Sequence, residues 1–228
     1  MRKEARYLKE GGSSKRKKKL KPKTKNQELY INTVSKSDVT FCTGPAGSGK
    51  TAVSVGLACE QLIKNNVEKI IITRPVIESG KGLGFLPGTF DEKIHPYMVP
   101  ILEEMRLYLG KTVLEKYRDE RIIEVCPLEY MRGRNFHGSF MILDEAQNAT
   151  LEQIKMFITR IGRGSKAIIN GDADQSDLPY NLRGSLEDCI EYLYDVKGVG
   201  IAELDDSDII RHKVISSILS NFPPPRNQ

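Results

Sequence analysis

Short apolar runs alternate with amphipathic stretches along most of the chain. Six runs have the length of a strand, and the most continuous of them suit strands that are buried on both faces of a parallel sheet. They cover residues 39–42, 68–73, 121–126, 140–143, 167–169 and 199–204. Apolar residues recur at helical spacing over residues 52–63, 91–109, 151–161 and 207–219. Strands that alternate with helices predict an α/β fold, a mostly parallel sheet with helices on both faces.

A glycine-rich loop connects the first of these strands to the first of these helices. It fits the pattern G-x-x-x-x-G-K-[ST] with Gly44, Pro45, Ala46, Gly47, Ser48, Gly49, Lys50 and Thr51. Backbone N–H groups can surround phosphates only where Cβ atoms are absent, and the helix N-terminus adds partial positive charge. We expect Lys50 to reach the β- and γ-phosphates and the Thr51 hydroxyl to bind Mg²⁺. Because a strand and a helix flank the loop, the pattern predicts a nucleoside triphosphate site rather than a chance glycine-rich turn.

Two later strands end in polar residues that suit the same site. The fourth apolar run is followed directly by Asp144 and Glu145. We expect Asp144 to hold Mg²⁺, directly or through water, and Glu145 to polarise the attacking water. A strand that ends in an acidic turn is common in isolation, but this one follows a phosphate loop at a suitable distance. The fifth run leads to a turn in which Asp172 and Gln175 are candidates to sense the γ-phosphate.

The formal net charge of +5 is distributed unevenly. Residues 1–25 contain twelve Lys or Arg and two Glu, a local charge of +10, which leaves −5 for the remainder. Because this stretch lacks apolar periodicity, we predict a disordered basic arm over residues 1–25, the P-loop domain over residues 26–222 and a short tail over residues 223–228. The arm would attract nucleic-acid phosphates through counterion release, or would only increase solubility.

Composition excludes several other classes of protein. No apolar run approaches the ~20 residues of a membrane span, and the basic N-terminus lacks the apolar segment of a signal peptide. The four cysteines are far apart, without a C-x-x-C pair, and the three histidines are scattered. These features predict a reduced, cytoplasmic protein with buried free thiols and without a structural metal.

A series of short motifs occurs in one order along the chain. The motifs are GPAGSGKT, TRP, GFLPG, PLEYMRGR, ILDEAQN, KMFITRIG, GDADQSDLP and DIIRH. The series resembles the PhoH-like family of cytosolic ATPases, whose core is similar to the ATP-binding domain of superfamily-one helicases. The resemblance covers about residues 26–222, and PLEYMRGR and GFLPG are particular to the family. It implies a single RecA-like P-loop NTPase domain that uses ATP and Mg²⁺.

The resemblance also assigns individual positions. Gln27 is similar to the glutamine that reads adenine in this family, and residues 73–75 correspond to its Thr-Arg-Pro motif. Three positions depart from the family pattern. Ser48 replaces the usual threonine, Lys81 stands where an acidic residue is expected, and Asp174 stands where threonine is expected. The last two departures concern an irregular segment and the sensor turn rather than nucleotide binding.

An arginine is the part of the mechanism that these motifs do not specify. P-loop ATPases often use an arginine finger to stabilise charge on the transferring phosphoryl group. Arg132, Arg134 and Arg211 are candidates, and the alternative for each is an ordinary surface arginine. Conventional helicases close two lobes over ATP, whereas one lobe is recognisable here. We therefore expect a homo-oligomer, such as a hexameric ring, with sites between subunits.

Together these features predict an ATPase that acts on RNA or single-stranded DNA, with remodelling or unwinding as its output. Two alternatives stay open. One is a nucleic-acid-binding module whose assembly is controlled by ATP with little turnover. The other is a small-molecule kinase, although a kinase would not need the acid pair or the basic arm. The guanine-reading motif N-K-x-D is absent, which disfavours a GTPase.

Overall fold

The computed structural model describes residues 18–75 and 90–210, apart from the side chains of residues 90–95. Within these residues, six strands form one sheet in the order β3-β2-β4-β5-β1-β6, and every neighbouring pair is parallel. The strands are β1 (Val39–Thr43), β2 (Lys69–Thr73), β3 (Ile123–Val125), β4 (Ser139–Leu143), β5 (Lys166–Gly171) and β6 (Val199–Glu203). Each coincides with a predicted strand to within a few residues, which confirms the predicted parallel sheet.

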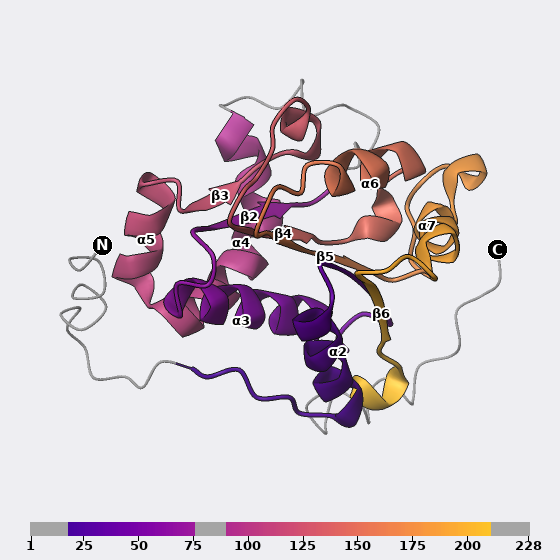
Figure 1. Ribbon diagram of the computed structural model, residues 1–228, viewed down its shortest axis with the longest axis horizontal. Helices are drawn as coiled ribbons and strands as arrows, with labels where there is room; N and C mark the ends of the chain where they lie inside the picture. The colour runs from indigo at the N-terminus through magenta and orange to yellow at the C-terminus, as the bar shows by residue number, and fades with distance from the viewer. Residues whose placement is uncertain (1–17, 76–89, 211–228) are drawn as a thin grey trace.

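Helices cover both faces of the sheet, as predicted (Figure 1). They are α2 (Lys25–Lys36), α3 (Lys50–Ile63), α4 (Phe90–Leu109), α5 (Lys111–Asp119), α6 (Leu151–Ile158) and α7 (Ser185–Leu193). One buried cluster joins α2, α3, α4 and α5 to the sheet. A second cluster joins α6 and α7 to the opposite face. None of the helices in the described part of the chain combines the length and apolar character needed to span a membrane.

Several helix boundaries differ from the sequence predictions. Helix α6 has a capping box between Thr150 and Gln153, and it ends at Ile158 rather than near residue 161. Helices α2, α5 and α7 were not among the predicted helices. Residues 206–208 form a 3₁₀ turn, η5 (Asp206–Asp208), rather than the start of the helix predicted over 207–219. The remainder of that predicted span, from residue 211 on, lies outside the described residues.

The segment before α2 lies against the domain. The Lys18 ammonium forms an ion pair with Glu104 at 2.5 Å and lies 5.0 Å from the centroid of the Tyr108 ring. The Leu20 N–H donates to the Glu60 carboxylate at 3.1 Å, and the Leu20 side chain packs against the core on this face. Residues 18–24, which the sequence analysis assigned to the basic arm, are therefore in contact with α3 and α4. Residues 1–17 lie outside the described part, so the disordered arm stays a prediction.

All four cysteines are buried and unpaired, which confirms the prediction of free thiols. Burial raises the pKa of Cys59 to about 12 and the pKa values of Cys126 and Cys189 to about 11. The pKa of Cys42 is raised further, again by burial. Because the thiolate is the reactive form of cysteine, these side chains serve as core residues in the folded protein.

Candidate nucleotide-binding site

The loop between β1 and α3 has the backbone that its glycines predict. Gly44, Gly47 and Gly49 have φ angles of +147°, +85° and +98°, which other residues rarely adopt. Close packing excludes side chains at two of them. A Cβ on Gly44 would lie 2.4 Å from the carbonyl oxygen of Leu204, and one on Gly49 would lie 2.7 Å from Nε2 of Gln27. The loop is therefore restricted to glycine by conformation and by space.

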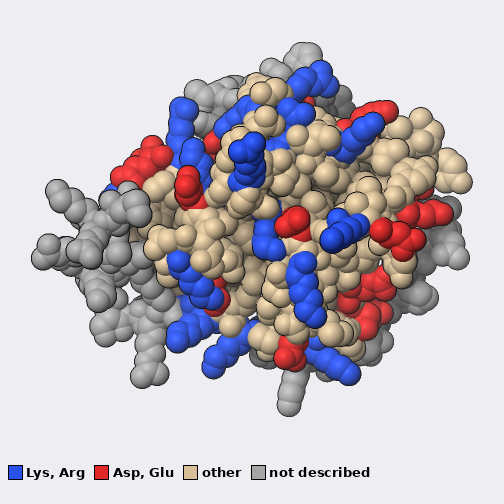
Figure 2. Space-filling view, viewed as in Figure 1, with Lys and Arg blue, Asp and Glu red and all other residues tan. Residues whose placement is uncertain are grey.

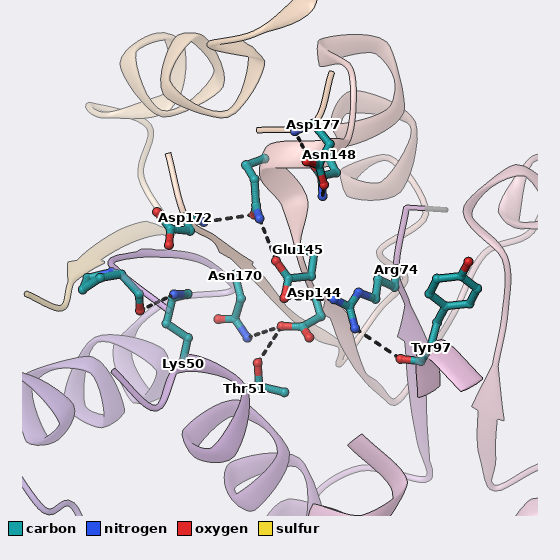
Figure 3. Close-up of polar contacts among 12 residues, drawn as sticks. Lys50, Thr51, Arg74, Tyr97, Asp144, Glu145, Asn148, Asn170, Asp172 and Asp177 are labelled. Carbon is teal, nitrogen blue, oxygen red and sulfur yellow. Dashed lines mark hydrogen bonds and ion pairs between the residues drawn. The ribbon is translucent and has the colours of Figure 1, made fainter. Parts of the chain in front are cut away.

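Lys50 lies at the first position of α3 and turns back into the loop (Figure 3). Its ammonium donates to the carbonyl oxygens of Gly44 and Pro45, at 2.5 and 2.9 Å. No side chain caps the helix N-terminus at Gly49, so the partial positive charge of α3 is directed at the same loop. An ammonium group and an uncapped helix N-terminus at one loop form an arrangement that favours phosphate binding.

The phosphate loop and the acidic strand end meet at Thr51. The Thr51 hydroxyl donates to Oδ1 of Asp144 at 2.9 Å, although 93 residues separate the two. Asp144 is almost fully buried. Burial and the neighbouring Glu145 charge raise its pKa, while the Thr51 hydrogen bond and the Arg74 charge act in the opposite direction. Hydroxyl and carboxylate oxygens are ligands that Mg²⁺ accepts, and a cation would offset the buried negative charge, so the donors fit this ion.

Glu145 occupies a strained backbone position beside this pair. Its φ of +57° lies in the left-handed region, and η3 (Ala146–Asn148) starts directly after it. One carboxylate oxygen forms an ion pair with Arg74 at 3.0 Å, and the other accepts from Nε2 of Gln147 at 2.6 Å. In the sequence, Arg74 stood out only as part of the Thr-Arg-Pro motif, and nothing paired it with Glu145. The sequence feature that could have identified Arg74 was its position as a charged residue at the end of a buried strand.

The predicted sensor turn follows β5 and reaches the same group. The backbone N–H of Asp172 donates to Oε1 of Gln147 at 3.0 Å. Asp172 is buried, and its Oδ2 has no hydrogen-bond partner among the described residues. The N–H of Gln175 donates to the Asp172 carbonyl at 3.1 Å, and the Gln175 side chain is exposed. The turn therefore lies beside the acid pair, while γ-phosphate sensing by Gln175 stays a prediction.

Two buried residues that the sequence analysis did not select support Asp144 from behind. The Tyr30 hydroxyl donates to Oδ1 of Asn170 at 2.7 Å. This bond orients the Asn170 amide so that its nitrogen donates to Ser54 at 2.9 Å and to Asp144 at 3.4 Å. Burial raises the pKa of Tyr30 well above its usual value, so this side chain acts as a neutral donor. Its distance of 140 residues from Asn170 in the chain hides the contact from sequence analysis.

Gln27 lies one turn before Tyr30 on the same helix. Its Nε2 donates to the carbonyl of Ser48 at 2.9 Å, and its Oε1 accepts from the N–H of Lys23 at 2.9 Å. The side chain is buried against the phosphate loop. A primary amide has a second N–H and a second lone pair, so each end keeps capacity for one more hydrogen bond. Adenine reading by Gln27 therefore stays a prediction, and the structure places this residue at the loop.

The three candidate finger arginines are in different situations. Both terminal nitrogens of Arg134 bind Glu124, at 2.5 and 2.9 Å, and its guanidinium lies 4.6 Å from the centroid of the Phe136 ring. Arg132 is exposed at the end of η2 (Leu128–Met131). Arg211, like Lys81, lies outside the described residues. To act on a neighbouring subunit, Arg134 would first have to break its ion pair with Glu124. Arg132 is already exposed at the surface.

Comparison with known proteins agrees with this geometry. The chain is 43% identical to a PhoH-like protein of Mycobacterium bovis over 92% of its own length and 59% of that protein. It is 42% identical to a PhoH-like protein of Bacillus subtilis over 90% of its length and 64% of that protein. The chain thus spans about three fifths of the length of these relatives.

Among solved structures, the large terminase of a thermophilic bacteriophage superposes with a TM-score of 0.57. The match covers 88% of this chain and 50% of the terminase at 12% identity, so the likeness concerns the fold alone. That fold is a single RecA-like P-loop domain. The sequence profile of the PhoH-like protein family matches residues 19–223, and the chain therefore belongs to this family.

Proposed function

We propose that this protein binds ATP together with Mg²⁺ and hydrolyses it. The contact between Thr51 and Asp144 at 2.9 Å carries the proposal, because it joins the phosphate-loop helix to the acidic end of β4. Lys50 lies within the loop, and Glu145 follows Asp144 directly. A phosphate-binding loop, a pair of oxygen ligands for a divalent cation and a second carboxylate are the parts that phosphoryl transfer to water requires.

Each of these residues has a distinct role in the proposed reaction. Lys50 and the loop N–H groups bind the β- and γ-phosphates and offset their charge. Thr51 and Asp144 would hold Mg²⁺, which supplies charge neutralisation at the phosphate oxygens. Glu145 accepts a hydrogen bond, and then a proton, from the water that attacks phosphorus. Gln27 binds the adenine edge with its remaining N–H and lone pair, so that base and phosphate recognition meet at one loop.

We further propose that hydrolysis is coupled to RNA or single-stranded DNA, with remodelling or unwinding as the output. The concentration of +10 charge in residues 1–25 supports this coupling. On the face of the domain seen in Figure 2, positive and negative side chains are interspersed, so that face has no comparable concentration of charge. The active form is a homo-oligomeric ring in which an arginine from one subunit reaches the nucleotide of the next.

The test is phosphate release measured during titration with RNA and with single-stranded DNA. The proposal expects turnover that either nucleic acid stimulates and that falls steeply with salt. Each neutralised phosphate contributes about −0.9 (duplex) or −0.7 (single strand) to the log–log slope of binding against salt. The contribution of the arm is tested with a variant that lacks residues 1–17. This variant keeps the segment that contacts α3 and α4. It should keep basal turnover and bind nucleic acid with a shallower salt slope.

Three results would point elsewhere. An unchanged salt slope after truncation would leave the arm as a solubilising segment. Slow turnover that no nucleic acid stimulates, combined with nucleotide-dependent assembly in sedimentation, would favour a binding module controlled by ATP. Phosphate transfer to a small molecule in place of water would favour a kinase.

A further inference from the structure

Both carboxylate oxygens of Glu145 are bound by other side chains (Figure 3). Arg74 forms an ion pair with Oε1 at 3.0 Å, and Gln147 donates to Oε2 at 2.6 Å. These partners are themselves anchored. Arg74 also donates to the carbonyl of Tyr97 at 3.2 Å, and Gln147 accepts from the N–H of Asp172 at 3.0 Å. The Glu145 carboxylate is thus fixed from two sides, by residues that follow β2 and β4.

The backbone of Glu145 indicates that this position is imposed by its surroundings. A non-glycine residue in the left-handed region is strained relative to the usual conformations. Such a conformation persists where surrounding contacts determine it, and it occurs often at functional sites. Here the Glu145 carbonyl accepts from the N–H of Asn148 at 3.0 Å, while the two side-chain contacts hold the other end. The residue is therefore preorganised before any ligand binds.

Electrostatics supply a second reason for an arginine at this place. Asp144 and Glu145 are adjacent acids, and Asp144 is almost fully buried. A guanidinium beside the pair therefore offsets the repulsion between two carboxylates that the proposed reaction needs in ionised form.

We propose that Arg74 is a positioning residue, which acts with Gln147 to hold the Glu145 carboxylate in the orientation for water activation. The inference rests on the proposed ATP hydrolysis. It adds Arg74, to which neither the phosphate-loop motif nor the acid-pair motif assigns a role in that reaction. Arg74 acts through Glu145 rather than on the nucleotide, because one of its nitrogens binds Glu145 and another binds the Tyr97 carbonyl.

The first measurement separates turnover from binding. Arg74→Ala should lower kcat by about 10²-fold, the cost of misplacing a reacting group by about 1 Å. The KM for ATP and the affinity for a fluorescent ATP analogue should stay within about twofold of the wild-type values. The substitution leaves the interactions that bind substrate and transition state equally unchanged. Arg106→Ala is the matched control, since Arg106 is exposed on α4, and it should leave both parameters unchanged. Thermal unfolding verifies that each variant is folded, and Arg74→Lys replaces Arg74→Ala if the latter is not.

The second measurement tests whether Arg74 acts through Glu145. In a Glu145→Gln background, Arg74→Ala should lower kcat by no more than about twofold, since residues that act as a unit are not additive. Millimolar guanidinium should restore part of the turnover of Arg74→Ala, because the half-exposed site admits a free cation. The variant Arg74→Lys should regain little of the lost turnover, since an ammonium cannot bind Glu145 and Tyr97 with the same planar geometry.

These results distinguish the two proposals. A wild-type protein without ATP turnover overturns the proposed function itself. If the wild type turns over and Glu145→Gln does not, then an unchanged or raised kcat in Arg74→Ala overturns the positioning role. A raised KM at constant kcat also overturns it, because Arg74 would then contact the nucleotide directly.

Discussion

Two arginine–glutamate pairs lie on the same sheet, and they differ in how many partners hold the carboxylate. Glu124, in the edge strand β3, is bound through both oxygens by one arginine, Arg134. Glu145, at the end of the inner strand β4, forms an ion pair with Arg74 through one oxygen and accepts a hydrogen bond from Gln147 through the other. The first carboxylate has a single bidentate partner, and the second is held by two separate partners.

We interpret Glu124 and Arg134 as a structural pair, and Glu145 and Arg74 as the pair that serves the proposed hydrolysis. A bidentate arginine beside an aromatic ring fixes the edge of the sheet and uses the directions in which Glu124 accepts hydrogen bonds most readily. Each oxygen of either carboxylate keeps a second acceptor site, because an ionised carboxylate has about four. Glu145 differs in its place, directly after Asp144 and beside the phosphate loop. A carboxylate that is fixed in direction yet able to accept another hydrogen bond is suited to bind a water molecule.

The largest expected effect concerns the arginine next to the structural pair. Arg132 is exposed and lies two residues from Arg134, which Glu124 retains. We expect Arg132→Ala to lower kcat by about 10³–10⁵-fold, the effect of losing an arginine finger. Because the proposed finger acts on a neighbouring subunit, mixing Arg132→Ala with Lys50→Ala should restore part of the activity. A monomer with full specific activity on dilution would contradict this assignment.

The next effect compares the two glutamates directly. Glu145→Gln keeps the side-chain shape and loses the basic oxygen, so turnover should fall by ~10²–10⁴-fold while ATP still binds. Glu124→Gln is the matched control, and it should leave kcat unchanged. Phosphate release and binding of a fluorescent ATP analogue measure both. Equal losses in the two variants would show that Glu145 has no special role.

The smallest effect concerns stability. Arg134→Ala removes the bidentate pair and the contact with Phe136, but its side chain is 40% exposed and partly screened by solvent. We expect a loss of about 1 kcal/mol in the free energy of unfolding, which lowers the Tm by roughly 2–4 °C in a domain of this size. Thermal denaturation with turnover measured per folded protein is the test. A collapse of kcat at constant Tm would transfer the finger role to Arg134.

The sequence predicted the strands and the chemistry of the loop because both depend on local patterns. Strands buried on both faces are continuous apolar runs, and the glycines of the loop have the positive φ angles that phosphate binding requires. Helices α5 and α7 were missed because their buried surface is small. Leu114 is the one buried residue of α5, whose other positions are mainly charged.

The side chains that orient the acid pair could not be derived in the same way. The contact of Arg74 with Glu145 depends on β2 lying beside β4, where Thr73 pairs with Leu143. That neighbour relation joins segments that are far apart in the chain, and no local pattern encodes it. Tyr30 and Asn170 are also distant from each other, and each reads as an ordinary core residue when taken alone.

The placement of Gln27 and Tyr30 on α2 has a consequence for the stability of the proposed nucleotide site. The two residues are three positions apart, so they project from nearly the same side of the helix. One contacts the phosphate loop, and the other fixes the asparagine behind Asp144. Local unfolding of α2 would therefore remove both contacts at once while the sheet stays intact. Retention of ATP at the proposed site would then be limited by the local stability of one twelve-residue helix rather than by the stability of the whole domain.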